Sequence, residues 1–265
     1  MTHSADLPPL YELVTLKETS DITAEAVRLA QQGADEGTVV WADSQTPGRA
    51  ASGTHWIGTE GGLLCALILR PEMPAAAVVQ LATVATVSLG AAMADIVSPL
   101  TRLDYRWPAS ILLNEGKAAG VWLTVGPATD KGFPWCIVSV GANILQPPTE
   151  LGLAAASVQG EGDCRTSPAE VLEHFARHFL VWVNRWAEEG FEPVQRTWMQ
   201  RVSGMGEHIR IALGKQTVAG TAASVDAEGA LFVDVAGHGA RRITLGEYFL
   251  DSGKPGGGSR GPERR

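Results

Sequence analysis

The chain has 265 residues, 45% hydrophobic and 19% charged, so it can bury a sizeable core. Its net charge is −8, and no run of Lys and Arg precedes the extreme C-terminus, so we expect no nucleic-acid partner. The cysteines Cys65, Cys136 and Cys164 form neither a disulfide framework nor a C-x-x-C spacing. Cys65 and Cys136 lie in apolar runs, which favours buried free thiols.

The N-terminal segment, residues 1–10, has neither the basic region nor the apolar region of a secretory signal, so we expect a cytoplasmic protein. One nearly uncharged segment, residues 75–97, is long enough to be compared with a membrane span. Its larger apolar residues fall near one helical face: Val78, Leu81, Leu89, Met93 and Ile96. We therefore predict a buried amphipathic helix here, and no association with a membrane.

Short apolar runs bounded by Gly and Pro predict strands that form a mixed sheet with helices packed on it, an α+β fold. The hairpin between Tyr105 and Val125 has a corner at Pro108 and a tight turn at residues 114–116. The other predicted elements of this part are strands at 13–16, 38–41, 63–69 and 136–140 and a helix at 22–31.

The clearest helix begins at Ser167-Pro168-Ala169-Glu170, which is a capping box with proline at the first helical position, and it ends at Gly190. Two histidines, His174 and His178, lie one turn apart on it and could hold a metal ion. The sequence shows no third ligand beside them, so we interpret them as surface histidines and predict no metal site.

After Trp198 the helical period gives way to short runs separated by glycine, which predict a small β-barrel of about five or six strands. Its predicted strands are 209–212, 217–222, 231–235 and 241–244. From residue 253 the chain is rich in Gly, Pro and Ser, and we expect a disordered tail.

Lys117 follows the predicted turn and enters an apolar strand, residues 121–125. An ammonium group in such a strand must find an anion or lose solvation. A snorkelling edge lysine would explain an isolated residue, but two further segments accompany this one. Upstream, the loop 45–56 is rich in glycine and carries one arginine; downstream, a strand ends in Gly141-Ala142-Asn143.

Four segments together resemble the catalytic domain of biotin–protein ligases, within the biotin/lipoate A/B protein ligase family. The family's signatures, a Q-T-x-G-R-G-R-x-G-x-x-W loop, [KR]-W-P-N-D, G-x-K-x-A-G and G-I-N, have counterparts in the same order at residues 45–56, 106–110, 116–120 and 141–143. The resemblance implies a class II synthetase-like domain over residues 1–203, an SH3-like C-terminal β domain over 204–252 and a disordered tail over 253–265. No winged-helix segment precedes residue 13, so we expect no repressor function.

By this resemblance the protein activates biotin or a related carboxylic acid with ATP and Mg²⁺, then transfers the acyl group to a lysine of a carrier domain. The catalytic residues would be Lys117, between the carboxylate and the α-phosphate, and Arg49, which closes over the acyl-adenylate. Asn143 would lie near the nucleotide. The implied substrate-binding residues are Gln45, Gly48, Ala50, Ala51, Trp56, Trp107 and Gly120.

Three departures weaken the expected site. Ala51 stands where the family has a second arginine, Ala109-Ser110 replaces Asn-Asp, and Asp21-Ile22-Thr23 stands where Ser-Thr-Asn lines the head-group pocket. Loss of one pre-organised phosphate contact can lower a rate by about 10²–10³. The sequence therefore predicts a divergent ligase with a degenerate triphosphate site.

Two alternatives stay open, and so does homodimer formation. An octanoyl or lipoyl transferase would take a pre-activated donor and need no triphosphate site. It would want a thiol, for which Cys164 is the candidate, although no activating group is evident nearby. The second alternative is a non-catalytic binder of a small acid, an adenylate or a carrier domain.

Overall fold

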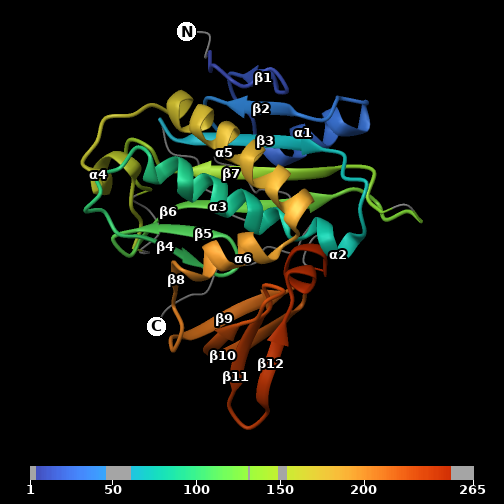
Figure 1. Ribbon diagram of the computed structural model, residues 1–265, viewed down its shortest axis with the longest axis vertical. Helices are drawn as coiled ribbons and strands as arrows, with labels where there is room; N and C mark the ends of the chain where they lie inside the picture. The colour runs from blue at the N-terminus through green and yellow to red at the C-terminus, as the bar shows by residue number, and fades with distance from the viewer. Residues whose placement is uncertain (1–3, 46–60, 131, 149–153, 252–265) are drawn as a thin grey trace.

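The computed structural model describes residues 4–45, 61–130, 132–148 and 154–251, which form two sheets (Figure 1). The larger is an eight-stranded mixed sheet in the order β1-β2-β3-β7-β6-β5-β4-β8, and the smaller is a four-stranded antiparallel sheet in the order β12-β11-β10-β9. The predicted α+β class, with a mixed sheet and packed helices, is confirmed.

The strands of the large sheet are β1 Glu12–Leu16, β2 Thr38–Ala42, β3 Leu63–Leu69, β4 Leu103–Arg106, β5 Ser110–Leu113, β6 Gly116–Val125, β7 Cys136–Ala142 and β8 Val202–Ser203. The small sheet contains β9 His208–Leu213, β10 Gln216–Val225, β11 Leu231–Val235 and β12 Gly239–Ile243. The helices are α1 Ile22–Gln31, α2 Ala75–Val78, α3 Leu81–Ala94, α4 Val158–Gly162, α5 Pro168–Glu189, α6 Glu192–Met199 and the π-helical turn η1 Glu247–Asp251.

One face of the large sheet is covered by α3, α5 and α6 (Figure 1). α3 lies between the sheet and α5, and nearly all of its residues are buried. The predicted amphipathic pattern is therefore wrong, because apolar surfaces enclose α3 on both sides. The segment Ala75–Ala94 is long and apolar enough to cross a membrane, but 78% of its window is buried inside the protein, as in a core helix.

The signals for helix ends and for the tight turn are confirmed. The Ser167 hydroxyl caps α5 by accepting a hydrogen bond from the Glu170 N–H at 3.2 Å, and Gly190 ends the helix with φ of 81°. Asn114 and Glu115 have positive φ, which closes the turn between β5 and β6. Between β7 and α5 the chain also forms the short helix α4.

The opposite face of the large sheet is covered in parts. α1 packs on β2, β3 and β7 through a second apolar cluster that includes Ala26 and Ile68. Beside β6, the ring of Trp122 meets those of Tyr248 and Phe249 of η1 at 5.7 Å and 5.3 Å. Between these two coverings lies a strip of the sheet that no described helix covers.

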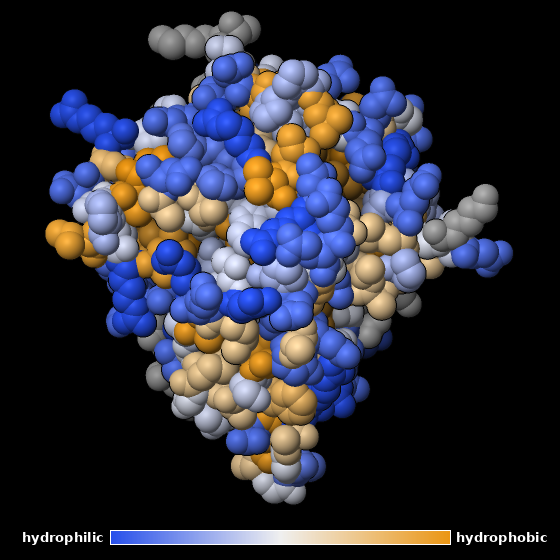
Figure 2. Space-filling view, in the orientation of Figure 1, coloured by the Kyte–Doolittle hydropathy of each residue, from blue (hydrophilic) through white to orange (hydrophobic). Residues whose placement is uncertain are grey.

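The small sheet lies below β4 and β8 in Figure 1 and is joined to the helix layer through its β10–β11 turn. The Gln195 side chain of α6 donates a hydrogen bond to the Asp226 carbonyl at 2.7 Å. Within the described chain this sheet has four strands, fewer than predicted. On the helix-covered side, hydrophilic side chains are interspersed with hydrophobic ones over the surface (Figure 2).

Candidate active site

A row of four residues crosses the uncovered strip of the large sheet. Strand register pairs Arg106 with Ser110, Ser110 with Gly120, and Gly120 with Gly141. Cross-strand partners share a face, so these residues lie side by side. The serine and the two glycines place no large side chain of their own over the backbone, as a close approach by a ligand requires; Ser110 and Gly120 are half-buried and Gly141 is buried.

Lys117 lies on the same face, just beyond this row. Its partner on β5 is Leu112, which is two residues after Ser110 and therefore shares the face of Ser110. A bulge between Ile111 and Leu112 sets this register, since without it the alternation along β6 would turn Lys117 toward the helices. The bulge thus places the lysine beside the glycine row.

The surroundings of Lys117 disfavour the charged form of its ammonium group. Its pKa is lowered, first because the surrounding protein desolvates it and second because the Arg106 guanidinium repels it. The residue as a whole is nevertheless exposed. Access to water and desolvation coexist when protein surrounds a side chain on several sides without covering it. A cation held in this way is stabilised by an approaching anion.

Arg106 is the site residue that the sequence analysis missed. It is 17% exposed in its side chain and donates a hydrogen bond from Nη2 to Glu207 Oε1 at 3.2 Å. The available signals were the basic first position of the motif at residues 106–110 and strand alternation. Tyr105 stacks on Trp198 of α6, so its neighbour Arg106 must face away from the helices, toward Lys117.

Asn143 lies next to Lys117 and fixes the backbone there. Its side-chain amide donates to the carbonyl oxygens of Ala156 at 3.0 Å and of Lys117 at 3.4 Å. Lys117 also exchanges backbone hydrogen bonds with the segment 154–156. The Asn143 Oδ1 atom is buried and accepts no hydrogen bond from any described residue. Asn143 therefore positions Lys117 and offers one buried acceptor.

Gln45 lies at the same end of the sheet as Lys117. It follows β2 by three residues and forms a parallel bridge with Thr19. The neighbours β2, β3, β7 and β6 bring the two residues to one end, three strand spacings apart, or roughly 14 Å. This is the scale of an extended small molecule that lies across the strands.

Trp107 is at the junction of the two sheets, outside the row that contains Gly120. It is 4% exposed, and its indole N–H donates to the Gly229 carbonyl at 2.9 Å. Its ring meets that of Tyr248 edge-on at 5.1 Å. These contacts give Trp107 a structural role between β4 and the C-terminal sheet.

Five predicted site residues, Gly48, Arg49, Ala50, Ala51 and Trp56, lie outside the described residues. The described residues on either side of that segment, Gln45 and Gly61, flank the strand ends nearest Lys117. The position of Arg49 relative to Lys117 remains a prediction.

Cys164 has no feature of an activated thiol. It is half-buried, and its Sγ donates to the Val158 carbonyl at 3.5 Å. Burial raises the pKa of the thiol, and the carboxylates of Glu170 and Asp163 raise it further. A protonated thiol is a poor nucleophile, so these surroundings disfavour acyl transfer through Cys164.

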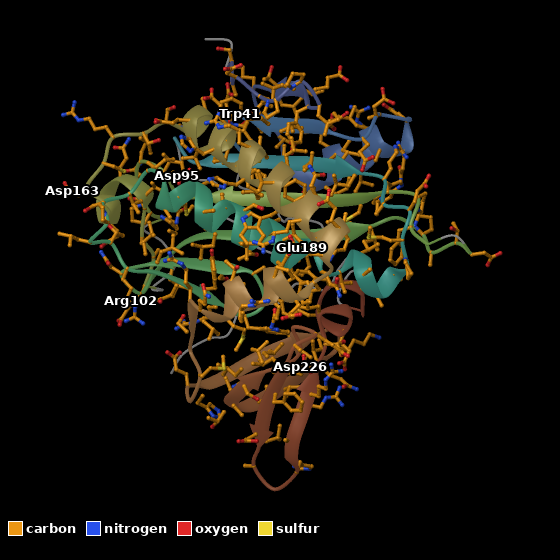
Figure 3. The ribbon with its side chains drawn as sticks, in the orientation of Figure 1. Trp41, Asp95, Arg102, Asp163, Glu189 and Asp226 are labelled. Carbon is orange, nitrogen blue, oxygen red and sulfur yellow. The ribbon has the colours of Figure 1, made fainter. Side chains whose placement is uncertain are left out.

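The two histidines of α5 have a third potential ligand, contrary to the sequence-based expectation. Asp95, at the C-terminal end of α3, brings Oδ2 to 3.2 Å from His174 Nδ1 and 2.7 Å from His178 Nε2. Asp95 directly follows α3, on the helix-covered side of the large sheet (Figure 3). The sequence could not show this group because packing of α3 on α5 creates it.

The family model and the similar proteins of known sequence point to the same family. The model of the biotin/lipoate A/B protein ligase family matches residues 7–200. A biotin–[acetyl-CoA-carboxylase] ligase of Paracoccus denitrificans is 33% identical over 223 residues, covering 82% of this chain and 92% of the relative. The bifunctional ligase/repressor BirA of Bacillus subtilis is 30% identical over 231 residues, covering 85% of this chain and 70% of the relative.

Solved structures show the same fold at lower identity. A biotin protein ligase-like protein of unknown function from Silicibacter has a TM-score of 0.75 at 22% identity, covering 93% of this chain and 100% of the other. A biotin protein ligase from Aquifex aeolicus, in complex with biotin and ATP, has a TM-score of 0.71 at 22% identity, covering 96% and 99%. The family match extends over most of the chain and includes β6, the strand that bears Lys117. The chain belongs to the biotin/lipoate A/B protein ligase family.

Proposed function

We propose that this protein is a biotin ligase that activates biotin, or a closely related acid, with ATP and passes the acyl group to a lysine of a carrier domain. The observation that carries the proposal is the pair of cations, Lys117 and Arg106, on one uncovered strip of the sheet beside Gly120 and Gly141. Related ligases support the choice of substrate, since one relative is a biotin–[acetyl-CoA-carboxylase] ligase and one neighbour binds biotin and ATP.

In the first step, a carboxylate oxygen of the acid attacks the α-phosphorus of ATP. A new phosphorus–oxygen bond forms, the bond to the β-phosphate bridge breaks, and pyrophosphate leaves with the electron pair. Negative charge accumulates on the α-phosphate oxygens, where Lys117 and Arg106 stabilise it. Desolvation, and then repulsion from Arg106, lower the pKa of Lys117 in the unliganded protein, so a bound phosphate would favour the protonated ammonium group.

In the second step, the ε-amine of the acceptor lysine attacks the acyl carbonyl. An amide bond forms, AMP leaves with the electron pair of the broken bond, and the amine loses a proton to solvent. Because Gly120 and Gly141 have no side chains, the acyl-adenylate can lie close to the backbone of β6 and β7. Arg49, which lies outside the described residues, is proposed to close over it.

The head group of the acid is proposed to lie toward Gln45 and α1, with its carboxylate toward Lys117. Thr23 Oγ1 and Ser139 Oγ, 2.7 Å apart, join the start of α1 to β7. They lie between the two ends of the proposed site in strand order. Hydroxyl groups here suit a polar ring better than an alkyl chain, which favours biotin over octanoate.

The triphosphate end of the site differs from the family pattern. Ser110 supplies no carboxylate, so the residues of this strip do not fit a protein-held Mg²⁺ at that position, and Ala51 supplies no second arginine. We propose that Arg106 supplies part of the missing positive charge. A slow ligase is the expected result, with a non-catalytic binder of the acid or its adenylate as the second candidate.

We further propose that the two sheets belong to two domains: a ligase domain of residues 1–203 and an SH3-like C-terminal domain of residues 204–252. The supporting observations are that β8 ends at Ser203 within the large sheet and β9 begins the small one at His208.

The test is ATP–pyrophosphate exchange by the full-length chain with biotin, lipoate or octanoate, beside calorimetry with a non-hydrolysable biotinyl-adenylate analogue. Biotin-dependent exchange supports the ligase. The double variant Ala51→Arg/Ser110→Asp should exchange faster than the parent, by about tenfold or more, since it restores two charged contacts. An inert double variant whose parent binds the analogue would establish the binder instead.

A further inference from the structure

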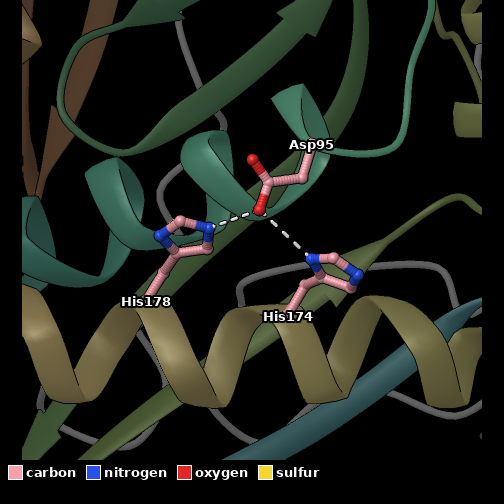
Figure 4. A group of neighbouring side chains, drawn as sticks. All are labelled: Asp95, His174 and His178. Carbon is pink, nitrogen blue, oxygen red and sulfur yellow. Dashed lines mark hydrogen bonds and ion pairs between the residues drawn. The ribbon is translucent and has the colours of Figure 1, made fainter.

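Two helices that are distant in sequence bring three potential metal ligands to one point on the surface. Asp95 ends α3, and His174 and His178 lie one turn apart on α5 (Figure 4). Both rings point at the same carboxylate oxygen, at 3.2 Å from His174 Nδ1 and 2.7 Å from His178 Nε2. The three ligand atoms all lie within 4.8 Å of one another.

The 3.2 Å separation is close to that between two ligands of one ion, and the 2.7 Å separation would have to lengthen by roughly half an ångström. Bonds of roughly 2.0–2.2 Å from zinc to nitrogen or oxygen place neighbouring tetrahedral ligands about 3.3 Å apart. A metal ion would take the place of the two N–H protons that now face Asp95 Oδ2. The three ligand atoms already lie within 4.8 Å of one another, so side-chain rotations are expected to suffice.

The two helices that carry these ligands are well packed. α3 is buried along almost its whole length, and α5 is a capped helix of 22 residues that packs against it. The side chains of His174 and His178 are 27% and 29% exposed, and that of Asp95 is 48% exposed. An ion can therefore enter from solvent, and water can complete its coordination.

We propose that Asp95, His174 and His178 form a binding site for a divalent transition-metal ion, with Zn²⁺ as the best match. Two imidazoles and one carboxylate suit zinc and related borderline ions, whereas Mg²⁺ and Ca²⁺ prefer a full set of oxygen ligands. The site is separate from the proposed adenylation site, because α3 and α5 cover the other face of the sheet. Its ion would tie the end of α3 to the middle of α5.

The site is tested with the full-length chain after chelation and dialysis. Titration with Zn²⁺ in a calorimeter should give one ion per chain, and Zn²⁺ at about a hundredfold excess over Kd should raise Tm by about 5 °C or more. Substitution of Co²⁺ should give the visible absorption of a metal bound by nitrogen and oxygen ligands.

The variants His174→Gln, His178→Gln and Asp95→Asn should each weaken Zn²⁺ binding by at least about tenfold, a loss that even more remote partners of metal ligands can cause. His208→Gln, in an exposed histidine of β9, is the matched control and should bind like the parent. Cys164→Ser shows whether the half-buried thiol competes for the ion.

Circular dichroism is used to check that each variant remains folded. Absence of saturable binding at about 100 µM Zn²⁺ would overturn the proposal, since a pre-arranged site of three ligands should be occupied at that concentration. So would binding that is unchanged in both Asp95→Asn and His178→Gln but lost in Cys164→Ser.

Discussion

The same strands form the buried core on one face of the large sheet and the proposed site on the other. On the face under α3, α5 and α6, side chains such as Leu123 and Val140 are almost completely buried. On the other face, between α1 and η1, the same strands carry Gly120, Gly141 and Lys117. Neighbouring residues of β6 therefore face opposite sides of the sheet, one toward the interior and the next toward the proposed site.

The difference shows why a site of this kind tolerates sequence change without loss of the fold. The free energy of folding comes mainly from the covered face, where apolar area leaves water. The uncovered strip contributes little apolar burial and holds two repelling cations in partly desolvated surroundings. Substitution of these cations should therefore affect ligand binding far more than stability.

The largest expected effect is on catalysis, from Lys117→Ala. This variant should lower biotin-dependent pyrophosphate exchange by about 10²–10³, because it removes a charge that acts on the α-phosphate. Its Tm should stay near that of the parent, since the ammonium group is desolvated and repelled by Arg106 in the folded state. Exchange assays and thermal unfolding measure the two quantities. Unfolding of the variant at the parent's assay temperature would contradict the contrast between the faces.

Leu123→Ala makes the opposite test on the same strand. Leu123 is 1% exposed on the covered face, so truncation should lower the free energy of unfolding by about 2–5 kcal/mol. Pyrophosphate exchange, measured well below the lowered Tm, should remain close to the parent's. A large loss of exchange in a folded Leu123→Ala protein would show that the covered face also shapes the site.

Local signals in the sequence predicted much of the fold. The capping box at Ser167 and the turn at Asn114 depend on residues within four positions of one another, so the sequence displays them directly. The burial of α3 does not, because it depends on packing against a sheet on one side and α5 on the other. The strand count of the C-terminal sheet likewise depends on pairing between distant segments.

The candidate site was predictable to the same extent. Lys117 was found from the glycine turn before an apolar strand and from its resemblance to a known motif. Arg106 was overlooked, although alternation from Tyr105 already turned it toward Lys117. Asp95 could not have been found, since 79 residues separate it from His174.

A smaller effect distinguishes the two roles open to Arg106, which contacts Glu207 beyond the large sheet. Arg106→Gln should lower exchange by about tenfold, because one of two cations near the phosphate is lost. Glu207→Gln breaks the same ion pair but keeps the cation, so its exchange rate should be near the parent's. Equal losses in the two variants, with equal falls in Tm, would assign Arg106 to attachment of the C-terminal sheet alone.

The smallest effect concerns the C-terminal sheet, where Asp226 organises the β10–β11 turn. Its Oδ1 accepts hydrogen bonds from the N–H groups of Glu228 and Ala230, and its Oδ2 accepts one from Arg242 Nε at 2.8 Å. Burial alone would raise the pKa of this carboxyl group, but the hydrogen bonds from Arg242 and the backbone outweigh burial and lower it. The ionised form is thus favoured by folding.

The sign of the pH dependence follows. Because the folded-state pKa of Asp226 lies below the unfolded value of about 3.9, its contribution to stability is fully present above that value. The contribution is lost as pH falls through the folded pKa. Asp226→Asn should therefore lower the free energy of unfolding by about 1–3 kcal/mol at pH 7, and by less in acid. Urea titrations at pH 7 and in acid, followed by tryptophan fluorescence, measure the free energy of unfolding at each pH. Trp107 reports on this sheet because its indole N–H donates a hydrogen bond to Gly229 in the same turn. Asp234→Asn, at an exposed carboxylate of β11, is the control, and a difference between Asp226→Asn and the parent that is constant from pH 7 to acid would contradict the role assigned to Asp226.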